Sequence, residues 1–256
     1  MPFSVSRPDL PTRDAPCVSV VIPMHNEEGA VGDLIARIVG AMREVASFEI
    51  VAVDDGSTDS TLDRLRAVQC DVPQLRILHH PRAGGQSAAV HSGVLAARAC
   101  LCCTLDGDGQ NPPEDLPRLL APLLHEPAAA GLVAGQRVGR QDTAAKKLAS
   151  RWANRLRDRV LKDGVRDTGC GLKAFEREAF LALPYFDHMH RYLPALFAAQ
   201  GRPITLVDVS HEPRTTGRSK YTNLGRAAVG IWDLLGVLWL KRRAKKTHAE
   251  EIAPGG

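Results

Sequence analysis

Two aspartates separated by one glycine, Asp106 and Asp108, directly follow the apolar run at 100–105. Two carboxylates this close repel each other unless a cation lies between them. Oxygen ligands suit Mg²⁺ or Mn²⁺, and Gln110 could add a neutral oxygen. A calcium loop also begins Asp-x-Asp-Gly, but its sixth position here is Asn111 instead of glycine. The segment therefore predicts a magnesium or manganese site formed by Asp106, Asp108 and Gln110.

Two further polar segments, 23–28 (PMHNEE) and 54–61 (DDGSTDST), also follow runs of apolar residues. The carboxyl ends of parallel strands meet at one edge of a sheet, and ligands bind in the crevice there. Helix capping by Ser57, Thr58 and Asp59 would be enough to explain the second segment alone. Three such segments together favour a ligand site at one edge of a sheet.

Short apolar runs alternate with helical patterns along the first half of the chain. Strands are expected at 18–22, 48–53, 75–78, 100–105 and 131–134, and helices at 30–45, 58–68, 86–99 and 113–124. Pro23 is expected to end the first strand. This alternation predicts an α/β fold with a mostly parallel central sheet and helices on both faces. Further along, we expect a basic helix at 143–162, a turn and short strand within 167–175, and a strand at 204–209.

Composition limits the possible classes of protein. The 256 residues are 44% hydrophobic, enough for a large core, and a net charge of +4 gives no argument for nucleic acid. The six cysteines suggest no disulfide framework, and the three in ACLCCTL are expected to be small buried apolar residues in a reducing cytoplasm. The polar segment 1–17 lacks the apolar centre of a signal peptide. No uncharged apolar run reaches about 18 residues, so no transmembrane helix is expected.

Several longer motifs resemble a known family. The segments SVVIPMHNEE, IVAVDDGSTDST, RAGGQSAAVHSG and TLDGDGQNPPEDLP resemble the family 2 glycosyltransferases, whose fold is termed GT-A. The segments DTGCGLKAF and EPRTTGRSKY resemble its polyprenyl-phosphate subgroup, which includes dolichyl-phosphate mannose synthases and bacterial undecaprenyl-phosphate sugar transferases. The resemblance spans 17–225. It implies a GT-A domain there, with flexible ends at 1–16 and 247–256 and an additional helix at 226–246.

The resemblance also implies roles for individual residues. Those implied for nucleotide binding are Pro23, Asn26, Glu27, Asp54, Asp55, Gly84 and Ser219. Those implied for catalysis are Asp106, Asp108, Arg137, Lys146, Ser150, Arg214 and Lys220. Within these sets, Asp55 is expected to recognise the base, and Arg137, Lys146 and Ser150 to face the acceptor phosphate. Lys146 replaces a more usual arginine, which puts a bidentate grip on that phosphate in doubt.

The chemistry that the resemblance implies is an inverting transfer from a UDP- or GDP-sugar to a polyprenyl phosphate, of the dolichyl-phosphate mannosyltransferase type. The diphosphate leaves with negative charge, which a divalent metal, Arg214 and Lys220 would stabilise. A phosphate monoester is mostly a dianion at pH 7 and needs no base. A sugar hydroxyl on a glycan or glycolipid would need one, and Asp115 is the best candidate. That acceptor, and a non-catalytic subunit that binds nucleotide-sugar, are the two alternatives.

The apolar stretch 227–240 contains Trp232 and Trp239 and only one charge, Asp233, before the basic run KRRAKK. As a helix it would span about 21 Å, less than a hydrocarbon core of about 30 Å. Tryptophans and cations suit the membrane interface, and each cation contributes about 1 kcal/mol near anionic lipid. We therefore expect a peripheral protein at the cytoplasmic face of a membrane. The alternative is a helix docked on the domain, on a second copy or on a membrane-protein partner. The basic helix at 143–162 is a second candidate for membrane contact, or else packs on the core.

Overall fold

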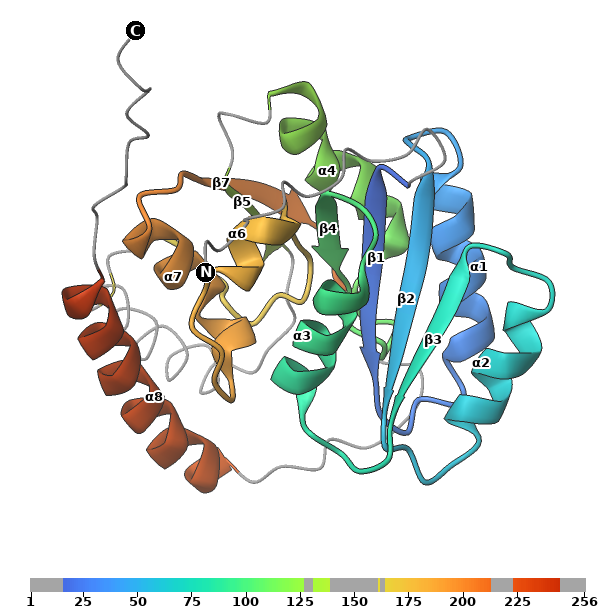
Figure 1. Ribbon diagram of the computed structural model, residues 1–256, viewed down its shortest axis with the longest axis horizontal. Helices are drawn as coiled ribbons and strands as arrows, with labels where there is room; N and C mark the ends of the chain where they lie inside the picture. Colours follow the sequence, from blue (N-terminus) through green and yellow to red (C-terminus); the bar gives the residue numbers. More distant parts are fainter. Residues whose placement is uncertain (1–15, 127–130, 139–160, 162–163, 213–222, 245–256) are drawn as a thin grey trace, which may run out of the picture.

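The computed structural model describes residues 16–126, 131–138, 161, 164–212 and 223–244 (Figure 1). For 223–229 only the backbone is described. Both chain ends and nearly all of the expected basic helix lie outside these ranges. The site residues that also lie outside them are Lys146, Ser150, Arg214, Ser219 and Lys220.

A seven-stranded sheet forms the centre of the described chain, with strand order β3-β2-β1-β4-β6-β5-β7. The strands are β1 (Val18–Met24), β2 (Phe48–Asp55), β3 (Leu75–His80), β4 (Leu101–Thr104), β5 (Leu132–Arg137), β6 (Lys173–Glu176) and β7 (Ile204–Val209). Every neighbouring pair is parallel except the two that involve β6, which is antiparallel to β4 and to β5. The expectation of a mostly parallel α/β sheet is confirmed.

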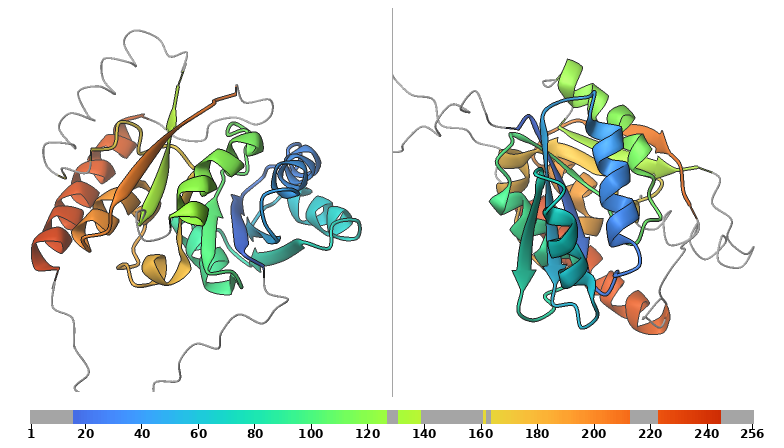
Figure 2. Two further views of the ribbon diagram at one scale, coloured as in Figure 1. Left: turned by 90° about the horizontal axis from the view of Figure 1, so that it is seen from above. Right: turned by 90° about the vertical axis from the view of Figure 1, so that its right-hand side faces the viewer.

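Helices cover both faces of the sheet (Figures 1 and 2). One face packs against α1 (Val31–Met42), α2 (Thr61–Gln69) and α4 (Leu116–His125), with the short 3-10 helix η1 (Pro113–Asp115) before α4. The other packs against α3 (Gln86–Ala96), α6 (Arg177–Leu181) and α7 (Leu193–Ala199), with the 3-10 helix η3 (Met189–Arg191) before α7. Along β1, Val20 and Ile22 face the first layer and Val21 the second, so both faces are buried and the strand is apolar throughout.

Several strand ends differ from expectation, most clearly those of β1, β2 and β3. β1 continues through Pro23, which pairs in parallel register with Val53. Proline removes one backbone donor, but its φ is compatible with an extended strand. β2 and β3 are each two residues longer than expected, because Asp54 and Asp55 pair in register with His79 and His80. The polar motif at 54–61 therefore begins inside the sheet.

The C-terminal helix α8 (Asn223–Arg243) is longer than the apolar run that predicted it. One side docks on the domain: Val237 is fully buried, His188 Nδ1 lies 3.0 Å from Asp233 Oδ2, and the Tyr192 hydroxyl donates to the Gly230 carbonyl at 3.3 Å. This much of the docked-helix alternative is confirmed. The apolar residues exposed on α8 are Ile231, Trp232, Leu235 and Trp239. No helix in the described ranges has the length and apolarity needed to cross a membrane.

Candidate active site

The loops after β1 and β2 bind each other at the carboxyl edge of the sheet. The side-chain oxygen of Asn26 accepts a hydrogen bond from the Thr58 amide at 2.7 Å, and the Asn26 amide donates to Ser57 Oγ at 2.9 Å. The next amide, of Glu27, donates to Thr61 Oγ1 at 2.8 Å. Asn26 has a φ of 56°, a left-handed conformation that asparagine tolerates better than most residues. Asn26 therefore holds the second loop against the first.

Asp59 in the second loop binds the first residue of α2, although the N-cap itself is Ser60, whose side chain makes no capping bond. Asp59 Oδ1 accepts hydrogen bonds from the amide of Thr61 at 3.0 Å and from its hydroxyl at 2.6 Å. Burial alone would raise the pKa of Asp59, but these bonds and one from the Glu28 amide lower it below the ordinary value. Ser57 and Thr58 instead bind Asn26, so capping accounts for only part of the motif.

The two acidic residues at the end of β2 are almost completely buried, with exposures of 0% for Asp54 and 4% for Asp55. Asp55 Oδ1 accepts hydrogen bonds from His80 Nδ1 at 2.7 Å and from the Gly84 amide at 2.8 Å, and Oδ2 accepts one from the Gly85 amide at 2.8 Å. These bonds fix the turn before α3. A carboxylate oxygen has two acceptor positions, so Oδ2 keeps one for a further donor. Recognition of a base by Asp55 stays a prediction.

Asp106 stands immediately beyond β4 and is held from two sides. Gln86 Nε2, at the start of α3, donates to Asp106 Oδ1 at 2.7 Å, and Asn111 Nδ2 donates to Oδ2 at 3.1 Å. Burial, and then the charge of Asp108, raise the pKa of Asp106. The carboxylate also lies against Gly171, where a Cβ would overlap it.

The donor set fits a hard divalent cation. Two aspartates that repel each other gain from a cation between them, and carboxylate oxygens are ligands that Mg²⁺ and Mn²⁺ prefer. Within the described ranges, no three His, Cys, Asp or Glu side chains come together as a ready metal site. Asp106 and Asp108 would therefore hold a metal together with oxygens from the nucleotide diphosphate, as Mg²⁺ commonly binds. Metal ligation by Gln110 stays a prediction.

Basic residues lie on the other side of Asp106. At the end of β5, Arg137 forms a bidentate ion pair with Asp167, through Nε at 2.6 Å and Nη2 at 2.9 Å. Lys173, the first residue of β6, is 4% exposed and its ammonium donates to the Cys170 carbonyl. Burial lowers the pKa of Lys173, and the nearby Cys170 and Asp106 offset this only in part.

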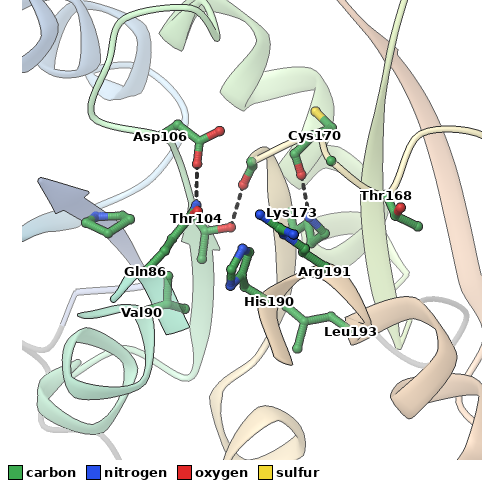
Figure 3. Close-up of a pocket in the computed structure, with 13 residues that line it drawn as sticks. Gln86, Val90, Thr104, Asp106, Thr168, Cys170, Lys173, His190, Arg191 and Leu193 are labelled. Atoms are coloured by element: carbon green, nitrogen blue, oxygen red, sulfur yellow. Dashed lines mark hydrogen bonds between the residues drawn. The ribbon is translucent and has the colours of Figure 1, made fainter. Parts of the chain in front are cut away.

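A cavity of about 380 Å³ opens between these groups (Figure 3). Asp106, Gln86 and Pro23 line one part of it, and Lys173 and Arg191 another. The remaining lining residues are Val90, Thr104, Thr168, Gly169, Cys170, Gly171, His190 and Leu193. The carboxylate that could hold a metal and two cations thus face one space.

The structure brings only some of the expected site residues to this cavity. Pro23 and Asp106 line it, and Arg137 is near enough to influence the pKa of Asp106. Asn26, Asp55 and the glycine at 84 belong instead to the neighbouring contacts at the ends of β1 and β2. The sequence analysis assigned no role to the lining residues Gln86, Lys173, His190 and Arg191. The first two lie inside motifs quoted for the resemblance, RAGGQSAAVHSG and DTGCGLKAF; the last two carry no local signal.

Comparison with known sequences supports the same family. The sequence profile described as glycosyl transferase family 2 matches residues 19–183. A dodecaprenyl-phosphate galacturonate synthase from Rhizobium johnstonii is 36% identical over 237 residues, which are 90% of this chain and 69% of the relative. An undecaprenyl-phosphate 4-deoxy-4-formamido-L-arabinose transferase from Pectobacterium carotovorum is 37% identical over 226 residues, 86% of this chain and 67% of the relative. The chain spans about two thirds of the length of both.

Solved structures show the same fold at lower identity. Glucosyl-3-phosphoglycerate synthase from Mycobacterium tuberculosis, in complex with Mn²⁺, UDP and phosphoglyceric acid, superposes with a TM-score of 0.68 at 21% identity, covering 90% of this chain and 80% of that one. A mannosyltransferase from Pyrobaculum calidifontis, with GDP-mannose and Mn²⁺, gives a TM-score of 0.62 at 21% identity, covering 90% and 66%. These similarities establish the architecture.

Proposed function

The chain belongs to glycosyl transferase family 2, and from that premise we propose that it transfers a sugar from a nucleotide-sugar to a polyprenyl phosphate, with inversion at the anomeric carbon. The observation that carries the proposal is the cavity in which Asp106 faces Lys173 and Arg191. We take this carboxylate as the group that holds the donor diphosphate through a cation, and the positive side chains suit anionic substrates. Both curated relatives are named for transfer to a polyprenyl phosphate.

The residues of this chain would act mainly by placing charge. A bound Mg²⁺ or Mn²⁺ held by Asp106 and Asp108 would neutralise the negative charge that develops on the leaving diphosphate. Gln86 and Asn111 fix the orientation of the Asp106 carboxylate through one hydrogen bond to each oxygen. We propose that Arg214 and Lys220, outside the described ranges, stabilise the same diphosphate, and that Lys146 and Ser150 contact the acceptor.

A phosphate acceptor also agrees with the environment of Asp115, the residue expected to serve as a base for a hydroxyl acceptor. Asp115 is 9% exposed, and its Oδ2 accepts a hydrogen bond from the Ser210 amide at 2.6 Å. Its Oδ1 accepts another from Arg118 at 2.9 Å. Both oxygens thus join η1 to the chain after β7 and to α4. A phosphate dianion needs no base, so this structural use of Asp115 does not hinder transfer to phosphate.

The test is transfer from a panel of UDP- and GDP-sugars to a short-chain polyprenyl phosphate in the presence of Mn²⁺. Mannose is only one candidate sugar, since the relatives are named for galacturonate and a formamido-arabinose. We expect one donor to give a lipid-phosphate sugar, and Asp106→Asn to abolish the product. The exposed Asp63→Asn in α2 is the matched control. Glycosylation of sugar hydroxyls alone would contradict the proposal, and undiminished biological function of Asp106→Asn would favour the non-catalytic alternative.

We also propose that the exposed side of α8 lies on the cytoplasmic face of an anionic membrane. Trp232 is 75% exposed and Trp239 60% exposed, on a helix whose other side is docked on the domain. Arg242 and Arg243 are exposed at the end of the same helix. Large apolar side chains beside cations are typical of helices that lie in a membrane interface. The free thiols of Cys17, Cys70 and Cys100, all exposed, are consistent with a reducing compartment.

Co-sedimentation with vesicles tests this surface. The wild-type protein should bind vesicles of phosphatidylglycerol and phosphatidylethanolamine more tightly than vesicles of phosphatidylcholine. Replacing both Trp232 and Trp239 by serine should weaken binding by about 10-fold or more. Leu95→Ser, at an exposed apolar residue of α3, is the control. The alternative is that α8 contacts a second copy of the chain. In that case the wild type would not bind vesicles but would form dimers, and the tryptophan variant would be monomeric.

A further inference from the structure

The cavity beside Asp106 contains more positive than negative charge. Among the described residues that line it, Asp106 is the only carboxylate, whereas Lys173 and Arg191 both contribute cations. His190 adds no charge at neutral pH: burial, followed by repulsion from Lys173, lowers its pKa well below the ordinary value. Figure 3 shows Lys173, His190 and Arg191 beside one another. The space between them thus has a surplus of positive charge.

Neither cation forms an ion pair with a carboxylate in the part of the chain that the structure describes. Within that part, the Lys173 ammonium has a single hydrogen-bond acceptor, the Cys170 carbonyl, although it can donate three bonds. Asp106 and Asp167 stabilise its charge only from a distance. No carboxylate in the described ranges forms an ion pair with the Arg191 guanidinium. A buried ammonium without an ion-pair partner is costly to the fold, so it is usually paired with an anion.

Arg137 shows the opposite arrangement. Its Nε and Nη2 are both bound by Asp167, which already neutralises its charge. An anion that enters this region would therefore gain more from Lys173 and Arg191 than from Arg137. The expectation that Arg137 faces the acceptor phosphate together with Lys146 and Ser150 stays a prediction.

We propose that Lys173 and Arg191 form an oxyanion subsite, which binds a carboxylate or phosphate group of one of the two substrates beside the donor diphosphate. The inference rests on the proposed function, because it takes the Asp106 side of the cavity as the diphosphate site. Two substrate groups have the required chemistry. One is the carboxylate of a uronic acid on the donor, and the other is the phosphate of the polyprenyl acceptor. His190, whose Nδ1 lies 2.8 Å from Ser87 Oγ, contributes a neutral polar wall that does not repel a sugar.

The decisive variants are Lys173→Met and Arg191→Gln. Methionine keeps much of the lysine volume in the buried position, and Arg191 is exposed, so its replacement should not disturb the fold. Arg202→Gln is the matched control. It removes a cation that pairs with Glu176 at 2.8 Å, at the other end of β6 from Lys173. Thermal unfolding of all three variants checks that each is folded.

Two pairs of ligands separate the possible sources of the anion. UDP-galacturonate has a carboxylate where UDP-galactose has a hydroxymethyl group, and farnesyl phosphate has a phosphate where farnesol has a hydroxyl. Calorimetry with Mn²⁺ present measures binding of each to the wild type and the variants. A carboxylate in the subsite predicts that both variants bind UDP-galacturonate about 10- to 100-fold more weakly, as expected for one lost charge-assisted hydrogen bond, with UDP-galactose unchanged. An acceptor phosphate in the subsite predicts the same loss for farnesyl phosphate alone.

Either selective loss supports the subsite and identifies the substrate that carries the anion. Affinities within twofold of the wild type for all four ligands would overturn it. An equal loss for both UDP-sugars and for UDP itself would also overturn it, since the cations would then bind the diphosphate. These measurements need no turnover. A protein that shows the selective loss but forms no polyprenyl-linked product would refute the proposed function and not the subsite.

Discussion

The carboxylate of Asp106 occupies space that only a glycine at position 171 leaves open. A Cβ built on Gly171 would overlap the Asp106 carboxylate, closer than real Cβ contacts come. The Gly171 carbonyl is itself fixed, because it accepts a hydrogen bond from Thr104 Oγ1 at 2.7 Å. The segment before β6 and the loop after β4 are therefore fitted to each other through these two residues.

Gly171→Ala should displace the Asp106 carboxylate without unfolding the protein. A misplacement of about 1 Å at a reacting centre can cost about 100-fold in rate, and we expect a loss of that order in kcat/KM. Steady-state kinetics and calorimetric Mn²⁺–UDP binding measure the effect. Gly40→Ala in α1 is the control, because a Cβ there meets nothing within 4 Å. Full activity of Gly171→Ala would show that the close fit is unimportant.

A second relationship joins three separate segments around Arg37 of α1. Its guanidinium binds Glu114 through Nε at 2.9 Å and Nη2 at 2.8 Å, and Glu212 through Nη1 at 3.1 Å and Nη2 at 3.0 Å. The Glu212 amide also donates to the Gln110 carbonyl in the loop after β4, at 2.9 Å. Arg37 thereby places the residue that directly precedes 213–222, where Arg214 and Lys220 lie in the sequence.

Arg37→Met should leave Glu114 and Glu212 to repel each other and should loosen the position of Glu212. Because these side chains are partly exposed, the loss of unfolding free energy should be small, roughly 1 kcal/mol. The KM for the nucleotide-sugar should rise several-fold, which is more than this small loss of unfolding free energy would cause. Kinetics and thermal unfolding separate the two effects. Arg43→Met, which removes a cation just beyond the same helix, should change neither; equal effects of both variants would contradict the anchoring role.

The sequence was sufficient to predict the central sheet, because both faces of β1 and β2 are buried and their apolar runs are continuous. The sequence-based ends of β2 and β3 were wrong. Asp54 and Asp55 are polar, so the apolar pattern stops before them, but both pair with the neighbouring strand at His79 and His80. We also expected all cysteines at 100–103 to be buried, whereas Cys100 is exposed. That residue precedes β4, where burial depends on the neighbouring chain instead of local composition.

The positive side of the cavity could not be predicted from local patterns. Lys173 reaches Asp106 because β6 runs antiparallel beside β4, pairing Lys173 with Thr104. Arg191 reaches the same space from η3, far from both in sequence. Asp106 could be assigned to the site from the sequence, because it belongs to a short acidic motif directly after an apolar run.

Glu49 should make stability depend on acid pH. The largest single influence on the pKa of Glu49 is burial, which raises it. Hydrogen bonds from Ser19, the Arg98 amide and Arg76 together outweigh burial and lower the pKa below the ordinary value. A lowered pKa means that the ionised carboxylate stabilises the fold above the pKa of the unfolded chain, and that this contribution is lost as pH falls through the folded pKa. Glu49→Gln should therefore cost about 2 kcal/mol at pH 7 and less near pH 3. Thermal unfolding across this range measures it; an equal cost at both pH values would contradict the assignment.

The six cysteines should divide into two reactivity classes. Burial raises the pKa of Cys102 to about 12 and also raises the pKa of Cys103 and Cys170, so their thiolates are scarce at neutral pH. The exposed thiols are Cys17, Cys70 and Cys100. Iodoacetamide at pH 8 should modify these three in the native protein and all six after denaturation, as peptide mass spectrometry would show. Rapid native labelling of Cys170 would indicate that the cavity wall opens.

A substitution at Asp115 best distinguishes a phosphate acceptor from a hydroxyl acceptor. Because its oxygens are bound by Arg118 and the Ser210 amide, Asp115→Asn should lower stability by about 1–3 kcal/mol, the cost of weakening buried hydrogen bonds. If the acceptor is a phosphate dianion, kcat below the unfolding temperature should stay within about threefold, since no proton has to be removed from the nucleophile. If this residue instead activated a hydroxyl acceptor, the variant would lose about 100- to 10,000-fold in kcat. Measuring kcat at pH 7 for wild type and variant decides between them, because a purely structural role lowers stability and leaves kcat nearly unchanged.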